Sequence, residues 1–298
     1  MKNKCDELKQ CIICPRKCKV NRTKSVGFCK ASVTLKIALA SLHEWEEPCI
    51  SGTRGSGAIF FSYCNLRCVY CQNYKISRGF GKEVSIERFS EICLELQNEG
   101  AHNINLVTPT HYIPQIIDGI KKAKSKGLNI PIVYNTGGYE LVDSIKKLNG
   151  IVDIYLTDLK YYADLYGEKY SNAKKYFEVA SSALDEMFNQ VGKNIIEAGI
   201  MKRGIIVRVL LLPGLVEDAK KIVEYLYDKY KDNIFISIMN QYTPVRDTPY
   251  PELNRKVDKK DYDELVDYAY DLGIRNAFIQ EDDASDLCFV PNFDKRGV

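Results

Sequence analysis

The chain has 298 residues, of which 45% are hydrophobic and 27% charged, a balance typical of a globular protein that can bury a core. Lys and Arg total 42 against 39 Asp and Glu, and a formal charge of +3 excludes the strong field that recruits nucleic acid or membrane surfaces. No apolar run approaches the roughly 20 residues that a membrane-spanning helix needs, and the start of the chain lacks the apolar core of a signal peptide. We therefore predict a cytoplasmic protein without nucleic-acid or membrane partners.

Cysteine is the unusual component, with 11 residues in the chain. Because the cytosol keeps thiols reduced, metal binding or catalysis is a more typical use for them than structural disulfides. Some are expected to be ordinary buried apolar residues, and these are Cys5, Cys49, Cys93 and Cys288.

Residues 1–57 carry many of the cysteines and no regular hydrophobic period, so we predict a separate cysteine-rich N-terminal cap there, followed by a catalytic domain over 58–298. Four cap cysteines follow the pattern C-x2-C-x3-C-x10-C, namely Cys11, Cys14, Cys18 and Cys29. Four thiolates so close together are typical of a closed metal site. Structural zinc and an auxiliary iron-sulfur cluster both fit, and the spacing does not choose between them.

From residue 58 onward, short β-branched apolar runs alternate with amphipathic stretches, which is typical of βα units and a parallel sheet. The predicted strands are 58–62, 103–108, 131–135, 152–157, 205–212, 234–239 and, more weakly, 277–280. The predicted helices are 85–99, 112–126, 138–148, 173–191, 216–231 and 259–272. This number of units predicts an α/β fold that is a partial (β/α)6 barrel of the TIM type rather than a complete eight-stranded barrel.

The loop after the first predicted strand reads "SYCNLRCVYCQNY" and holds Cys64, Cys68 and Cys71. Structural zinc usually takes four ligands, whereas three thiolates fit a 4Fe-4S cluster with one iron left open. S-adenosylmethionine (SAM) can bind such an iron through its amino and carboxylate groups, and an electron from the cluster can then release a 5'-deoxyadenosyl radical. The three cysteines are therefore candidate cluster ligands.

Unusual residues follow the next strands, at the carboxyl ends where parallel barrels carry their chemistry. They lie in "TPTH" at 108–111, "NTGGY" at 135–139, "TDLKYY" at 157–162 and "PGL" at 213–215. We expect these segments to meet at one edge of the sheet, beside the three cysteines.

The segment "CNLRCVYC" on the first strand-to-helix loop, with Tyr70 before the last cysteine, resembles the radical SAM superfamily. The segments "DLK" at 158–160 and "VRVLLLPG" at 207–214 resemble glycyl-radical-enzyme activases related to pyruvate formate-lyase activating enzyme. The segments "CPRKCKVNR", "PIVYNTGGYE" and "NQYTP" resemble a group of activase-like proteins of unassigned substrate. The resemblance implies a 4Fe-4S cluster held by the three cysteines, and bound SAM.

The resemblance also implies SAM contacts, which involve Tyr70, Thr108, Thr110, His111, Asn135, Thr136, Gly137, Asp158, Lys160 and Arg208. Backbone beside Tyr70 would meet the adenine, and residues 135–137 the ribose and methionyl group. Asp158 would bind the ammonium and Lys160 the carboxylate, with a surface ion pair as the alternative.

This chain departs from the activases at two places. Their glycine-rich "GGE" is replaced by "TPTHY", where Thr110 either contacts SAM or caps the following helix. The Asp that precedes the turn after their third strand is replaced by Tyr134. Arg208 lies within an apolar strand and needs either SAM or a buried carboxylate of the fold as its partner.

The resulting hypothesis is an enzyme whose radical abstracts hydrogen from a glycine of a glycyl radical enzyme, with a flavodoxin- or ferredoxin-type reductant. One alternative is a radical SAM enzyme that acts on a small molecule or another peptide. The other is a non-catalytic iron-sulfur electron carrier. Tyr242, after the sixth strand, is a candidate wall of the substrate pocket.

Overall fold

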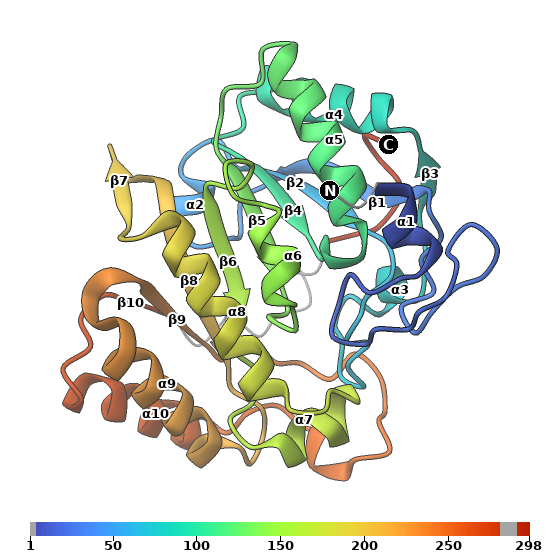
Figure 1. The fold of residues 1–298 in the computed structure, drawn as a ribbon. Coiled ribbons are helices and arrows are strands. Elements are labelled where there is room, and N and C mark those ends of the chain that lie inside the picture. The colour runs from blue at the N-terminus through green and yellow to red at the C-terminus, as the bar shows by residue number, and fades with distance from the viewer. Residues whose placement is uncertain (1–3, 281–290) are drawn as a thin grey trace.

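The computed structural model describes residues 4–280 and 291–298, with backbone alone for residues 4–6. Its centre is one curved mixed sheet (Figure 1) with the strand order β10-β9-β8-β6-β5-β4-β2-β1-β3, and β7 pairs with β8 beside it. The strands are β1 (Leu35–His43), β2 (Ser56–Phe61), β3 (Lys82–Val84), β4 (Ile104–Val107), β5 (Ile132–Thr136), β6 (Ile154–Asp158), β7 (Ile195–Glu197), β8 (Ile200–Leu210), β9 (Phe235–Met239) and β10 (Ala277–Ile279).

The run from β2 through β4, β5, β6, β8 and β9 to β10 pairs in parallel throughout, as the alternating sequence pattern predicts. Every residue of β2 and β4 is buried, in keeping with strands that are covered on both faces. In the described residues the edge strands β10 and β3 pair with one neighbour each, so the barrel stays open. The predicted partial (β/α)6 barrel is confirmed.

Helices follow the parallel strands and cover the outside of the sheet (Figure 1). Their bounds are α1 (Lys4–Lys9), α2 (Pro48–Ser51), α3 (Tyr74–Ser77), α4 (Ile86–Asn98), α5 (Ile113–Ser125), α6 (Val142–Lys146), α7 (Asp164–Ser171), α8 (Tyr176–Val191), α9 (Val216–Tyr230) and α10 (Lys259–Asp271). Short 3-10 turns lie at Thr110–Tyr112, Lys231–Asn233 and Pro251–Leu253. None of the helices in the described residues is both long enough and apolar enough to span a membrane.

Strand β1 was not predicted from the sequence, although its residues are largely apolar. It pairs antiparallel with β2 on one side and with β3 on the other. The end of the chain continues this edge, because the amide of Lys295 donates to the carbonyl of Ala38, and that of Ala40 to the carbonyl of Arg296. The later part of the predicted cap therefore contributes a strand to the sheet, and the domain boundary at residue 57 stays a prediction.

Two of the cysteines expected to be ordinary core residues are indeed buried. Cys49 lies in α2 and Cys93 in α4, where it is fully covered. Cys288 and the side chain of Cys5 lie outside the described residues.

Candidate active site

A cavity of about 540 Å³ opens at the carboxyl ends of the parallel strands. Most of the residues predicted from the sequence line it, namely Cys64, Cys68, Cys71, Tyr70, Thr108, Asn135, Thr136, Gly137, Asp158, Lys160 and Arg208. Tyr242, the predicted wall residue, lines it as well. The structure thus brings together side chains that lie up to 178 positions apart in the chain, from Cys64 to Tyr242.

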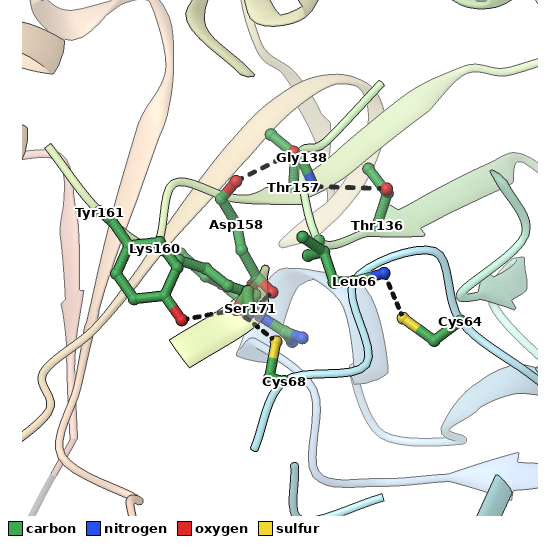
Figure 2. A network of polar contacts seen from close by, with 12 residues as sticks. Cys64, Leu66, Cys68, Thr136, Gly138, Thr157, Asp158, Lys160, Tyr161 and Ser171 are labelled. Carbon is green, nitrogen blue, oxygen red and sulfur yellow. Dashed lines mark hydrogen bonds and ion pairs between the residues drawn. The ribbon is translucent and has the colours of Figure 1, made fainter. Parts of the chain in front are cut away.

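The cysteine loop has a tightly turned backbone, with Tyr63 at φ 76° and Arg67 at φ 54°. These positive values are uncommon for residues other than glycine and cluster at functional sites. The turn places the amide of Leu66 3.3 Å from Cys64 Sγ, and the Ser171 hydroxyl donates to Cys68 Sγ at 3.0 Å (Figure 2). Three thiols that line one cavity, with hydrogen bonds to Cys64 and Cys68, are the donor types that an iron-sulfur cluster with an open iron takes.

Burial governs the protonation of Cys64 and Cys71. It raises the pKa of the Cys64 thiol to about 11, with a further contribution from Cys68, and that of the Cys71 thiol to about 12. These two thiols are therefore neutral in the metal-free site near pH 7, and cluster loading has to release their protons because the ligand is the thiolate.

Asp158, at the end of β6, and Lys160 face each other in the cavity wall beside the cysteine loop (Figure 2). Lys160 Nζ lies 2.5 Å from Asp158 Oδ2. Burial alone would lower the pKa of Lys160, but the Asp158 carboxylate and the Cys68 thiol raise it above its ordinary value. The ion pair considered from the sequence is present, but it lines the cavity, and its side chains are only 13% and 24% exposed.

The turn after β5 is built from two glycines that allow close approach. A Cβ on Gly137 would lie 2.6 Å from Leu66 Cδ1 of the cysteine loop. Gly138 has φ 79°, and a Cβ there would lie 2.2 Å from the carbonyl oxygen of Asp158. At Gly138 only glycine fits without displacing the end of β6, whereas at Gly137 a larger residue would require the Leu66 side chain to shift. The turn therefore packs closely against both the cysteine loop and the end of β6.

The structure does not bring Thr110 and His111 to the cavity, although Thr108 lines it. Thr108 has φ 59°, and the chain beyond it turns back into the protein. Thr110 makes no helix-capping bond, so the capping alternative is wrong, and its hydroxyl donates to Glu140 Oε1 at 2.5 Å. His111 Nε2 hydrogen-bonds to the carbonyl of Ser62 at 2.8 Å.

Glu140 is a buried carboxyl group that the sequence analysis did not single out. Thr136 donates to its Oε1 at 2.5 Å and Tyr134 at 3.3 Å, while its Oε2 has no hydrogen-bond partner among the described residues. Burial raises its pKa to about 7, against the lowering effect of the three hydroxyls. Thr110 and Thr136 thus support the ends of β4 and β5 through this group.

We predict that Glu140→Gln changes how stability depends on pH. Between about pH 4.5 and 7 the unfolded chain ionises Glu140 while the folded chain keeps its proton, so the wild type loses up to ~3 kcal/mol of unfolding free energy as pH rises. Gln mimics the protonated acid, so its stability relative to the wild type should rise over that interval and level off above it. Urea denaturation under anaerobic conditions from pH 5 to 8 measures this, and a difference that stays constant with pH would contradict it.

Arg208 finds its partners within the fold. Its Nε lies 2.8 Å from Glu47 Oε1 and one terminal nitrogen lies 2.6 Å from Glu47 Oε2, and the same nitrogen pairs with Glu46. Burial alone would lower the pKa of Arg208, but Glu47 and Glu46 hold it well above its ordinary value. Of the two partners considered from the sequence, the buried carboxylates are the ones the structure shows. The sequence feature that could have indicated these partners is the pair of consecutive acidic residues, Glu46 and Glu47, shortly after the apolar stretch of β1.

The four cap cysteines meet around a second, much smaller cavity of about 10 Å³. Cys11, Cys14, Cys18 and Cys29 line it together with His111. A Cβ on Gly27 would lie 2.8 Å from Cys18 Sγ, so this sulfur is closely packed. Within residues 4–280 and 291–298, no group of three or more His, Cys, Asp or Glu side chains is already arranged to hold a metal ion. The structure shows that the predicted ligands are neighbours and does not show a metal site.

Comparisons with known proteins agree with this arrangement. Residues 58–226 match the model of the radical SAM superfamily. The chain is 28% identical over 272 residues to an uncharacterized protein of Methanocaldococcus jannaschii, covering 88% of this chain and 74% of that protein.

Solved structures show the same fold at low sequence identity. Streptococcus suis SuiB bound to the precursor peptide SuiA matches with a TM-score of 0.51 at 14% identity, over 74% of this chain and 47% of that one. HydG, a maturase of the FeFe-hydrogenase, matches with a TM-score of 0.50 at 17% identity, over 72% of this chain and 49% of that one. The matched part thus spans about half the length of those proteins. With the family model covering more than half of the sequence, the chain belongs to the radical SAM superfamily.

Proposed function

We propose that this protein holds a 4Fe-4S cluster through Cys64, Cys68 and Cys71, and SAM beside it. The bound pair would supply reductive cleavage of SAM to a 5'-deoxyadenosyl radical, which abstracts a hydrogen atom from a substrate. The observation that supports this most strongly is the cavity itself, which is lined by the three thiols, the Asp158–Lys160 pair and the turn at residues 135–137.

The chain's own residues would bind and orient SAM. Asp158 offers a carboxylate to the SAM ammonium, and Lys160 an ammonium to its carboxylate, in a water-poor setting where charge-assisted hydrogen bonds are strongest. The existing Asp158–Lys160 contact would open to admit SAM. Asp158 and Lys160 would then each pair with a charged group of SAM in place of one another. Gly137, which lines the cavity and packs closely against Leu66 of the loop, would lie beside the methionyl end. Arg208 is already paired with Glu46 and Glu47. It would therefore shape the cavity and contribute to its electrostatic field, and would not bind SAM as a free cation.

The proposed target is a glycine of a partner glycyl radical enzyme, supported by the activase-like "DLK" and "VRVLLLPG" segments. A flavodoxin- or ferredoxin-type protein would deliver the electron. Mixing the reduced, SAM-loaded protein with a candidate glycyl radical enzyme should give an organic radical signal in electron paramagnetic resonance (EPR) that changes when the glycine is deuterated. If the candidate glycyl radical enzyme gives no radical signal and hydrogen is abstracted instead from a small molecule or another peptide, the alternative radical SAM reaction on such a substrate is favoured.

The SAM contacts can be tested through binding. SAM should change the EPR spectrum of the reduced, reconstituted protein, and Asp158→Asn or Lys160→Met should weaken the apparent affinity about tenfold or more, because each removes a buried charge-assisted contact. Lys169→Met, which removes an exposed lysine paired with Glu252, should leave the affinity unchanged. A cluster signal that is indifferent to saturating SAM would contradict the proposal and favour an electron carrier.

A second metal centre at Cys11, Cys14, Cys18 and Cys29 is proposed separately, supported by the small cavity that all four line. Their side chains would have to rotate to enclose a zinc ion or an auxiliary cluster. Elemental analysis of the full chain should then find zinc, or iron beyond the first cluster, that disappears in Cys14→Ala and persists in Cys93→Ala. Metal contents that are the same in both variants would contradict this centre.

A further inference from the structure

Three buried hydroxyl groups form a chain of hydrogen bonds that ends on a predicted cluster ligand. Ser171 Oγ lies 3.0 Å from Cys68 Sγ. The Tyr161 hydroxyl lies 2.7 Å from Ser171 Oγ, and the Tyr70 hydroxyl lies 2.7 Å from that of Tyr161. Figure 2 shows Tyr161, Ser171 and Cys68 in this order. The three hydroxyls come from the cysteine loop, the segment after β6 and the end of α7.

The direction of donation along this chain follows from the acceptor at its end. A ligand thiolate has no hydrogen and can only accept, so the hydrogen of Ser171 goes to Cys68. Ser171 Oγ is then free to accept from Tyr161, whose oxygen in turn accepts from Tyr70. All three bonds are oriented toward the sulfur, and hydrogen bonds in such a chain polarise and strengthen one another.

The surroundings keep these hydroxyls dry. Ser171 is 2% exposed, Tyr161 0% and Tyr70 6%. In such a low-dielectric setting the dipoles of the three hydroxyls act strongly on a nearby charge.

The chain of hydroxyl groups is also held in place by contacts between α7, the cap and the cysteine loop. Arg16 of the cap donates to the carbonyl of Ser171 at 2.9 Å and to that of Asn65 at 2.9 Å. The amide of Val69 donates to the carbonyl of Tyr170 at 2.9 Å. These contacts fix the end of α7 against the loop that carries Cys68, so the Ser171 hydroxyl is preorganised beside the sulfur.

We propose that the Tyr70–Tyr161–Ser171 chain raises the reduction potential of the cluster by donating to Cys68. The inference rests on the proposed function, since it needs a cluster on this cysteine. One-electron reduction, by dithionite in the test below, adds one negative charge to the cluster and moves no atoms. Donors aimed at a ligand sulfur stabilise that extra charge, and hydrogen bonds to cluster sulfurs are known determinants of potential. The three side chains are positioning residues, not catalytic ones.

The test is an anaerobic redox titration of the reconstituted full chain, with dithionite as reductant and the EPR signal of the reduced cluster as readout. Ser171→Ala should shift the midpoint potential to a more negative value. Tyr161→Phe should shift it less and Tyr70→Phe least, because the removed hydroxyl lies progressively farther from the sulfur. Ser171→Thr keeps the hydroxyl and should restore the wild-type potential. Ser182→Ala, which removes an exposed hydroxyl of α8, should not change it.

The outcomes separate this inference from the proposed function. If the wild type and variants all carry iron and show the same potential, the hydroxyl chain does not tune the cluster and the inference is overturned, while the proposed function stands. If the wild type binds no cluster, both fail. Should Ser171→Ala not fold, the two Tyr→Phe variants keep the ring shapes and decide the question on their own.

Discussion

Replacing Arg208 with Met is expected to lower the free energy of unfolding by about 3–5 kcal/mol, because it leaves two buried carboxylates without their cation. The side chains of Glu46 and Glu47 are only 7% and 5% exposed, and Arg208 holds the pKa of Glu47 below its ordinary value even though burial alone would raise it. Urea denaturation near pH 7 measures the loss. The variant should recover part of its stability at lower pH, where the carboxyl groups become protonated.

Two further variants show whether the charge arrangement is responsible. Combining Arg208→Met with Glu46→Gln and Glu47→Gln removes all three charges and should regain most of the lost stability. Arg88→Met breaks an exposed pair with Glu95 and should cost only about 0–1 kcal/mol. Equal losses in Arg208→Met and Arg88→Met would show that the buried network is not what stabilises this end of the barrel.

Replacing Cys64, Cys68 or Cys71 with Ala is expected to remove the cluster, and with it about four iron atoms per chain. Each thiol lines the cavity, and with one ligand gone only two remain to hold a cluster that already has an open iron. Iron analysis and the visible absorbance of the anaerobically reconstituted protein measure the effect.

Cys93→Ala is the matched control, since Cys93 is fully buried in α4 and away from the cavity. Its iron content should equal that of the wild type, apart from any modest loss of fold stability. If all four variants kept the same iron content, the cluster would have to be held elsewhere in the chain.

Much of the barrel was predictable because the central parallel strands are short apolar runs whose residues are largely buried. The strands β2, β4, β5 and β6 were predicted to within two residues at each end. β1 was missed because it precedes the βα rhythm and pairs antiparallel, so no crossover helix marks it. Its apolar sequence, "LKIALASLH", was read together with the cysteines around it as part of the cap.

The site residues that directly follow strand ends were predictable. Those whose position depends on contacts with distant parts of the chain were less so. Asp158 and Lys160 line the cavity because β6 ends there, as the pattern indicates. Thr110 and His111 follow a strand too, but the positive φ of Thr108 turns them into the protein interior. Neither the Thr110–Glu140 nor the Ser171–Cys68 hydrogen bond could be predicted, because the two partners lie 30 and 103 positions apart in sequence.

The central claim is that this protein cleaves SAM reductively, and the product, 5'-deoxyadenosine, can be quantified. The anaerobically reconstituted wild type, given SAM and dithionite, should produce 5'-deoxyadenosine, while Cys64→Ala, Cys68→Ala and Cys71→Ala should produce none above the protein-free background. A wild type that carries its full complement of iron, binds SAM and still yields no 5'-deoxyadenosine, with or without a candidate partner protein, would contradict the claim.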